Sequence, residues 1–227
     1  MTLPASAHPP APQDAPFVSA FTDLWARWQQ DMSPTFVSRT ADNWTGWFTA
    51  YITECANRRT HTAPNTGSYL RHRDLTGAVP LIMDAVERTG HYEVPADVVN
   101  STPLQAMRHS TTRVINITQD VQSLPKEETA GDPHNLVLVL ERHQGLSRQQ
   151  ALARIHTMTR GYTDTFLAHE ATVPHLLDTL GTPIKDRPLI YRHTTDLRTL
   201  MKGGADFCTR SGRYSTHQGA ARSEDEG

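Results

Sequence analysis

The chain has 227 residues, with 22 Lys and Arg side chains against 24 Asp and Glu, which gives a formal net charge of −2. A chain of this length forms one domain or at most two, and its balanced charge provides no field that would gather nucleic acid or an anionic membrane. Two cysteines are too few for a disulfide framework or a zinc site, and the longest apolar run, 136–140, is too short to span a bilayer. No signal-peptide pattern begins the chain. The sequence therefore predicts a reduced, cytoplasmic protein without nucleic-acid or membrane partners.

The two ends of the chain differ in composition from its middle. Residues 1–16 contain five prolines among small residues, and residues 216–227 are rich in Gly, Ala and Ser with an acidic end. Such segments have little apolar surface to bury, so we expect both to be disordered. The predicted organisation is a disordered segment over 1–16, a helical domain over 17–215 and a disordered tail over 216–227.

Apolar residues in the middle recur at helical spacing. A first helix carries an apolar face from Phe17 to Trp28 and ends at 32–34, where Ser33 can cap a second helix that stops near the turn at 64–67. Further helices are expected from Ser68 with an interruption at Thr76 and Gly77, and over 104–128, 133–143, 148–180 with a break at Pro174, and 184–207. The run at 136–140 fits a buried strand or a buried helical turn, and its helical neighbours favour the helix. Since no alternation of period two is found, the sequence predicts an all-α fold.

A polar stripe lies on the longest of these predicted helices. Gln119, Ser123 and Glu127 are each four residues apart, which places them on one face. A short hydroxyl group between two longer oxygen-bearing side chains can converge on a small, hard cation such as Mg²⁺. A polar stripe is also typical of a solvated helix face, so the pattern alone leaves both interpretations open.

The stretch around this stripe resembles the second metal-binding motif of bacterial class I terpene synthases, Asn-Asp-x-x-Ser-x-x-x-Glu. Gly-Asp-Pro-His-Asn-Leu-Val follows at 131–137, much as in that family. Upstream, 69–77 is similar to the family's diphosphate-sensor segment, and downstream Arg213 and Tyr214 resemble its C-terminal Arg-Tyr pair. Segments 20–25 and 31–34 read like its middle helices. The ordered motifs over 17–215 indicate a family member of the sesquiterpene cyclase kind.

This resemblance implies an α-helical bundle of the class I terpene synthase type. It implies a lyase that uses Mg²⁺ to ionise and cyclise a linear prenyl diphosphate, with farnesyl diphosphate as the expected substrate, and that releases diphosphate. By the same resemblance, the Mg²⁺ ligands are Gln119, Ser123 and Glu127; the sensor, linker and effector are Arg73, Thr76 and Gly77; the diphosphate ligands are Arg73, Lys126, Arg213 and Tyr214; and Tyr214 assists catalysis.

The residue types suit these roles, although each has a simpler interpretation. A guanidinium group offers a fixed fork of donors to phosphate oxygens, and a glycine in a helix break permits close backbone approach. Alternatively, Arg73 pairs with Asp74 or Glu87, Gly77 only ends a helix, and Tyr214 only packs. Aromatic side chains suited to cation–π contacts in the cavity are Trp44, Trp47 and Phe166, whereas tryptophans at helical spacing, here Trp25, Trp28, Trp44 and Trp47, are more typical of a core.

Two departures from the family pattern bear on activity. Gln119 is one methylene longer than the Asn or Asp of the motif, which leaves Ser123, Glu127 and Asp120 to compensate, and Pro125 should bend the helix. The chain has no adjacent Asp pair, whereas the family carries an aspartate-rich motif on an earlier helix. We therefore expect a bundle that is incomplete at its N-terminus. The alternative to an enzyme is a truncated non-catalytic homologue or a helical binding protein without turnover, and a homodimer or a completing partner chain is the expected assembly.

Overall fold

The computed structural model describes residues 15–60, 62 and 64–212, and over these residues it contains helices and no strand. The helices are α1 (Ala15–Gln29), α2 (Pro34–Thr60), α3 (Thr66–Thr76), α4 (Val79–Thr89), α5 (Ala96–Val99), α6 (Thr102–Ala130), α7 (Leu136–Gln144), α8 (Arg148–Glu170), α9 (Val173–Thr179) and α10 (Arg187–Arg210). The prediction of an all-α fold is confirmed.

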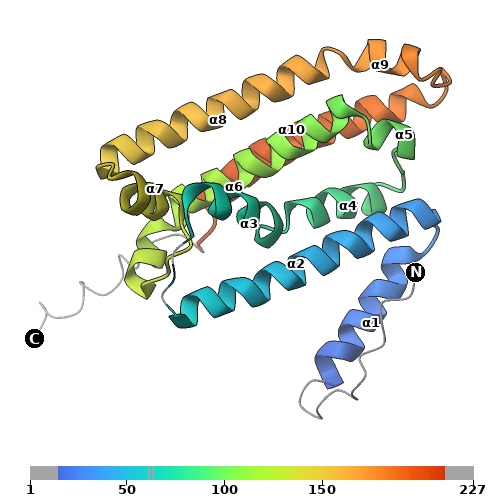
Figure 1. The fold of residues 1–227 in the computed structure, drawn as a ribbon. Helices are drawn as coiled ribbons and strands as arrows, with labels where there is room; N and C mark the ends of the chain where they lie inside the picture. Colours follow the sequence, from blue (N-terminus) through green and yellow to red (C-terminus); the bar gives the residue numbers. More distant parts are fainter. Residues whose placement is uncertain (1–14, 61, 63, 213–227) are drawn as a thin grey trace, which may run out of the picture.

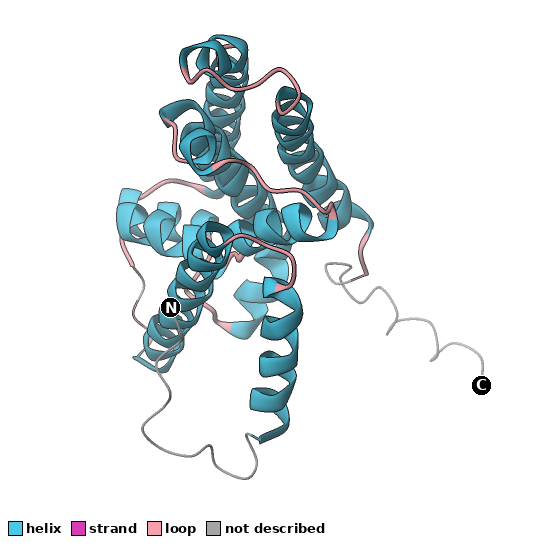
Figure 2. Ribbon diagram, turned by 90° about the vertical axis from the view of Figure 1, so that its right-hand side faces the viewer, coloured by secondary structure: helices cyan, strands magenta, loops and turns pink. Residues whose placement is uncertain are grey.

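Helix α6 is the centre of the bundle, and it contacts α3, α4, α7, α8 and α10 (Figure 1). Helices α3 and α4 follow each other along one line, with α2 on their other side and α8 across α6 from them. Figure 2 shows the same helices turned by 90°. Residues that face one another across the α2, α3 and α6 layers can therefore line a common cavity.

Several helix ends follow the residues that predict them. The Ser33 hydroxyl accepts a hydrogen bond from the Phe36 amide at 3.2 Å, so it caps α2 as expected. The Asn65 side chain caps α3, and the Asn135 side chain caps α7 by accepting from the Val137 amide at 2.9 Å. Because Asn135 takes the capping position, α7 begins at Leu136 rather than at residue 133, and the run at 136–140 is helical.

Proline positions explain most remaining differences from the predicted bounds. Helix α1 begins at Ala15 with Pro16 in its first turn, so the expected disorder over 1–16 does not extend to these two residues, while 1–14 and 216–227 lie outside the described residues. Pro174 likewise lies in the first turn of α9 rather than at the break that precedes it. A proline is tolerated in a first turn because no intrahelical partner exists there for the missing N–H. Pro125, by contrast, lies inside α6, which continues to Ala130.

Two clusters of buried apolar side chains form the core. One joins α4, α5, α6, α8, α9 and α10 and includes the fully buried Phe166 of α8, which places that ring in the core. The other joins α3, α6, α7 and α8 around Tyr69, Ile117 and Leu136. The candidate site described below lies beside this second cluster, because both contain Tyr69.

Aromatic rings on α1 and α2 form a face that is only partly covered. Phe21, Trp44, Trp47 and Phe48 lie in consecutive edge or stacked contacts, with ring centroids 4.9 to 5.8 Å apart along the series. Phe17 and Ile52 beside them are 78% and 72% exposed. Part of the apolar surface of these two helices therefore meets solvent. In the part of the chain that the structure describes, no helix is long and apolar enough to cross a membrane.

Candidate active site

One face of α3 lines a cavity of about 300 Å³. Tyr69, His72, Arg73, Thr76 and Gly77 are spaced three and four residues apart, so they share one side of the helix. The opposite walls come from α2, from α6 and from the segment before α7. The structure thus brings the predicted sensor, linker and effector positions into one cavity.

The charged group of this face is Arg73, and its partners are on α6. Its Nε donates to Oδ1 of Asp120 at 3.0 Å, and its Nη2 donates to Oε1 of Gln119 at 2.7 Å. Asp120, which is 1% exposed, also accepts from the Tyr69 hydroxyl at 2.5 Å and from the Leu136 amide at 3.2 Å. The two suggested surface partners of Arg73 are therefore wrong, because α3 packs against α6 and presents Arg73 to Asp120.

The protonation states of this group follow from burial and charge. Burial alone would lower the pKa of Arg73, but the charge and hydrogen bond of Asp120, together with Tyr69 and Glu127, outweigh burial and raise that pKa. Burial raises the pKa of Asp120, and Arg73 and the Tyr69 hydroxyl oppose this rise only in part. Burial and the nearby carboxylate raise the pKa of Tyr69 well above its ordinary value. Arg73 thus stays charged and Tyr69 stays a hydrogen-bond donor.

The polar stripe on α6 faces the same cavity. Gln119 and Glu127 line it, and Ser123 lies between them at 4% exposure. The Asn135 amide holds Glu127 by donating to its Oε2 at 2.7 Å. Burial raises the pKa of Glu127, and hydrogen bonding from Asn135 and Ser123 opposes the rise only in part. The interpretation of this stripe as a wholly solvated face is therefore wrong.

The stripe provides oxygen donors of the type that Mg²⁺ binds. An amide oxygen, a hydroxyl and a carboxylate lie along one helix face, and hard divalent cations take such ligands together with water or phosphate oxygens. Among the described residues, no three His, Cys, Asp or Glu side chains are grouped so that they could hold a metal ion. The donor set fits Mg²⁺ in chemical type only if Gln119 and Ser123 take part. Asp120 does not line the cavity, because its carboxylate is engaged by Arg73 and Tyr69.

The Asn116 side chain packs against the backbone at the break between α3 and α4. A Cβ atom at Gly77 would lie 1.9 Å from Oδ1 of Asn116, whose Nδ2 donates to the Arg73 carbonyl at 2.9 Å. Gly77 is therefore required by this close approach, and its φ of −68° is an ordinary helical value. It also caps α3, and Ala78 after it takes the left-handed φ of 58°. The Thr76 hydroxyl, at the predicted linker position, is buried without a hydrogen-bond partner.

A second group of charges forms the rim, and the sequence analysis did not identify it. Arg58 of α2 donates to Asp132 at 2.8 Å and also pairs with Glu54. Burial would raise the pKa of Glu54, but the nearby His72, Arg58, His134 and Arg73 together outweigh burial and lower it. Hydrogen bonds from His134 and Arg58 likewise outweigh burial and lower the pKa of Asp132. The sequence carried a signal only for His72, which lies four residues before Thr76 and therefore on the same face of α3.

The remaining predicted residues fall elsewhere. Lys126 is exposed on α6 and does not line the cavity, and Arg213 and Tyr214 lie outside the described residues. Trp47, which its helical spacing assigned to the core, lines the cavity. The Trp44 ring contacts the Trp47 ring, with centroids 5.8 Å apart. The structure thus groups Arg73, Thr76, Gly77 and two members of the metal stripe around the cavity, and buries Ser123 between those two.

Comparison with known proteins shows the family of the chain. A family model described as terpene synthase family 2, C-terminal metal binding, matches residues 2–164. The chain therefore belongs to the terpene synthase family, and most of it matches that family's metal-binding domain.

Similar proteins are found in species of Streptomyces and Saccharothrix. The chain is 34% identical over 217 residues to pentalenene synthase of Streptomyces avermitilis, which covers 94% of this chain and 65% of that protein. It is 33% identical over 216 residues to (−)-β-caryophyllene synthase of Saccharothrix espanaensis, covering 94% of this chain and 60% of that one. The crystal structure of linalool/nerolidol synthase from Streptomyces clavuligerus has a TM-score of 0.81 at 28% identity, over 91% of this chain and 69% of that chain. The chain spans less than two thirds of the length of the two sequence relatives.

Proposed function

We propose that this chain carries the Mg²⁺ and diphosphate site of a class I terpene synthase and acts in the ionisation and cyclisation of a linear prenyl diphosphate. The observation that carries the proposal is the direct hydrogen bond between Arg73 and Gln119, which joins the sensor position to the metal stripe within one cavity. Farnesyl diphosphate is the proposed substrate, since one relative is named for cyclising (2E,6E)-farnesyl diphosphate. A cytoplasmic location and a homodimer or completing partner chain remain predictions.

At the diphosphate end, the cavity supplies positive charge and oxygen ligands. Gln119, Ser123 and Glu127 would hold Mg²⁺, which when bound neutralises charge on the departing diphosphate. Arg73 keeps its Nε on Asp120 while its Nη2 exchanges the Gln119 oxygen for a phosphate oxygen. Since Asp120 is itself held by the Tyr69 hydroxyl, the guanidinium keeps its orientation through this exchange.

Beyond the diphosphate, the cavity is suited to a hydrocarbon chain and its cation. The aromatic side chains of Trp47 and Tyr51 line it, and aromatic faces attract positive charge. The backbone at Gly77 and Ala78 lines the same space, where a carbonyl freed by the helix break stabilises a developing carbocation. Trp47, Tyr51 and this backbone are thus the groups proposed to face the prenyl cation, while the rest of the cavity lining is largely polar.

A thermal melt of the purified chain tests the site. Mg²⁺ and inorganic diphosphate together should raise the melting temperature, because a ligand that binds only the folded state stabilises it, and either ligand alone should have less effect. Arg73→Ala should abolish the joint shift. Arg71→Ala, which removes an exposed arginine from the same helix, is the matched control and should retain it.

Turnover is tested separately by incubating the chain with Mg²⁺ and farnesyl diphosphate and analysing the volatile products by gas chromatography. Hydrocarbon or alcohol products would support the enzyme. A joint thermal shift without products would favour the non-catalytic homologue. No shift in a well-folded chain would contradict the proposed site itself.

A further inference from the structure

His72 is a cavity residue to which neither the family motif nor the metal stripe gives a role. It lies one residue before Arg73 and one helical turn before Thr76, on the face of α3 that lines the cavity. Its side chain is 16% exposed. It therefore lies in the same cavity of about 300 Å³ as the proposed diphosphate ligand Arg73.

The Nε2 atom of His72 has unused hydrogen-bonding capacity. This atom is buried and makes no hydrogen bond, and its nearest acidic neighbour is Oε2 of Glu54 at 3.7 Å, beyond hydrogen-bond length. Most buried polar atoms in proteins have a partner, and the His72 side chain lines the cavity, so a ligand atom that enters beside Glu54 would supply the missing hydrogen bond.

The neighbouring histidine provides a contrast within the same cavity. The rings of His72 and His134 have centroids 6.1 Å apart. In His134, Nδ1 is 3.0 Å from Asp132 and Nε2 is 3.3 Å from the Asn57 amide, so both nitrogens are satisfied by the protein. His134 thus has both nitrogens hydrogen-bonded within the protein, whereas Nε2 of His72 has only the longer ion-pair contact with Glu54.

The charged groups around His72 indicate what this partner is. A carboxylate only accepts hydrogen bonds, so Glu54 favours the state of His72 in which Nε2 carries a hydrogen. Arg58 of α2 and Arg73 of α3 add positive charge to the same walls, and Glu127 of α6 belongs to the metal stripe. A hydrogen-bond donor beside two arginines is suited to bind an oxygen atom of an anion that enters the cavity together with a metal ion.

We propose that His72 is a further diphosphate-binding residue, whose Nε2–H donates a hydrogen bond to a phosphate oxygen held by Arg73. This inference rests on the proposed function and adds one contact to the same site. The ligand chemistry is that of a diphosphate group, whether free or attached to a prenyl chain.

Isothermal titration calorimetry with inorganic diphosphate at saturating Mg²⁺ tests the contact. His72→Phe keeps a ring but has no donor, and it should weaken diphosphate binding about tenfold, which is typical of one lost hydrogen bond to a charged group. His72→Gln keeps a donor and should retain most of the affinity. His156→Phe, at an exposed histidine of α8, is the matched control and should bind like the wild type.

A second measurement uses the unaltered chain. In histidine side-chain ¹⁵N NMR, the Nε2 signal of His72 should shift on addition of diphosphate with Mg²⁺, while that of His134 should move little. This measurement decides the question if His72→Phe fails to fold.

The outcomes separate the two proposals. Unchanged affinity in His72→Phe, or an unmoved His72 signal, with binding that Arg73→Ala abolishes, would overturn the role of His72 alone. Equal losses in His72→Phe and His72→Gln, accompanied by lower melting temperatures without ligand, would show a structural residue and also overturn it. A folded wild-type chain that binds no diphosphate would overturn both proposals.

Discussion

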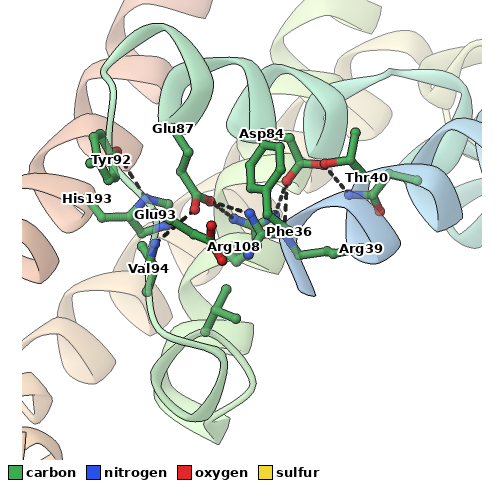
Figure 3. Close-up of polar contacts among 12 residues, drawn as sticks. Phe36, Arg39, Thr40, Asp84, Glu87, Tyr92, Glu93, Val94, Arg108 and His193 are labelled. Carbon is green, nitrogen blue, oxygen red and sulfur yellow. Dashed lines mark hydrogen bonds and ion pairs between the residues drawn. The ribbon is translucent and has the colours of Figure 1, made fainter. Parts of the chain in front are cut away.

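Two clusters of buried charge connect α6 to the helices beside it, and they use their arginines differently. In the cavity cluster, Asp120 of α6 faces Arg73 and Tyr69 of α3. In the second cluster, Arg108 of α6 faces Asp84 and Glu87 of α4, both fully buried, and Arg39 of α2 joins them (Figure 3).

The difference lies in where the donors of each arginine go. In the second cluster, Arg39 donates to both buried carboxylates, and Arg108 donates to Asp84 and forms a longer ion pair with Glu87 at 3.6 Å. Asp84 also accepts from Asn43 at 2.7 Å. A cavity of about 260 Å³ reaches both arginines there, but their carboxylate partners are already in place. Arg73 divides its donors between buried Asp120 and Gln119 at the cavity wall. The same ion-pair chemistry therefore fastens helices in one place and presents a donor to a cavity in the other.

The largest expected effect comes from breaking the second cluster. Asp84→Ala removes one of two carboxylates and leaves Arg39 and Arg108 short of a buried partner, so we expect a loss of about 4 kcal/mol in the free energy of unfolding. Urea denaturation followed by circular dichroism measures it. The control Asp42→Ala, at an exposed position on α2, should change stability by less than about 0.5 kcal/mol. A loss below about 1 kcal/mol in Asp84→Ala would contradict the role assigned to this cluster.

The helix break between the clusters should tolerate no side chain. Gly77→Ala places a Cβ 1.9 Å from Asn116, so we expect a loss of about 3 kcal/mol from overpacking. Gly161→Ala in α8, where nothing lies within 4 Å, should instead stabilise by about 0.5 to 1 kcal/mol. Adding Asn116→Ala to Gly77→Ala should recover part of the loss. If both glycine variants behaved alike in chemical denaturation, the close approach would not constrain this position.

A smaller stability effect with a larger effect on binding is expected in the cavity cluster. Tyr69→Phe removes only the hydroxyl that donates to Asp120, and we expect a loss of about 2 kcal/mol. Because Asp120 orients Arg73, diphosphate binding at saturating Mg²⁺ should weaken as well, as measured by calorimetry. Tyr162→Phe on α8 serves as the control for loss of a tyrosine hydroxyl. Unaltered affinity in Tyr69→Phe would show that Arg73 does not depend on this contact.

The effect that is smallest at neutral pH, and that grows as the pH falls, concerns a buried histidine beside the second cluster. Burial, together with the charges of Arg108 and Arg39, lowers the pKa of His193 to about 3 from its ordinary 6.5. Between these two pH values the unfolded chain binds a proton that the folded chain does not, so stability falls as the pH decreases through this window. The slope from this group is at most about 1.4 kcal/mol per pH unit.

The variant His193→Gln isolates this contribution. Its free energy of unfolding should decline less between pH 6.5 and pH 4 than that of the wild type, as urea denaturation at each pH will show. Burial raises the pKa of Glu87, which makes the folded chain more stable as the pH decreases. This contribution is the same in the wild type and in His193→Gln, so it does not affect their difference. Parallel pH profiles for the two proteins would mean that His193 does not titrate differently on folding.

Much of the site could be predicted from residues that share one helix. The spacing of Gln119, Ser123 and Glu127 places them on one face of α6, and the structure orients that face toward the cavity. The position of Arg73 and the interruption at Gly77 were also readable, because a glycine and a following proline mark a helix break. What could not be read was that Asn116, 43 residues away from Arg73, occupies the space left by the absent side chain.

The sequence by itself determined that the middle of the chain is helical, that Ser33 caps α2 and on which face each polar residue lies, because these depend on neighbours within a few residues. Only the tertiary structure decided that Arg73 meets Asp120, 47 residues along the chain, rather than Asp74 beside it. It also decided that His72 and Glu54 share a cavity and that Phe166 does not reach it. The physical reason is that periodicity fixes the direction of a side chain on its own helix, whereas its partner depends on which helix faces packing brings together.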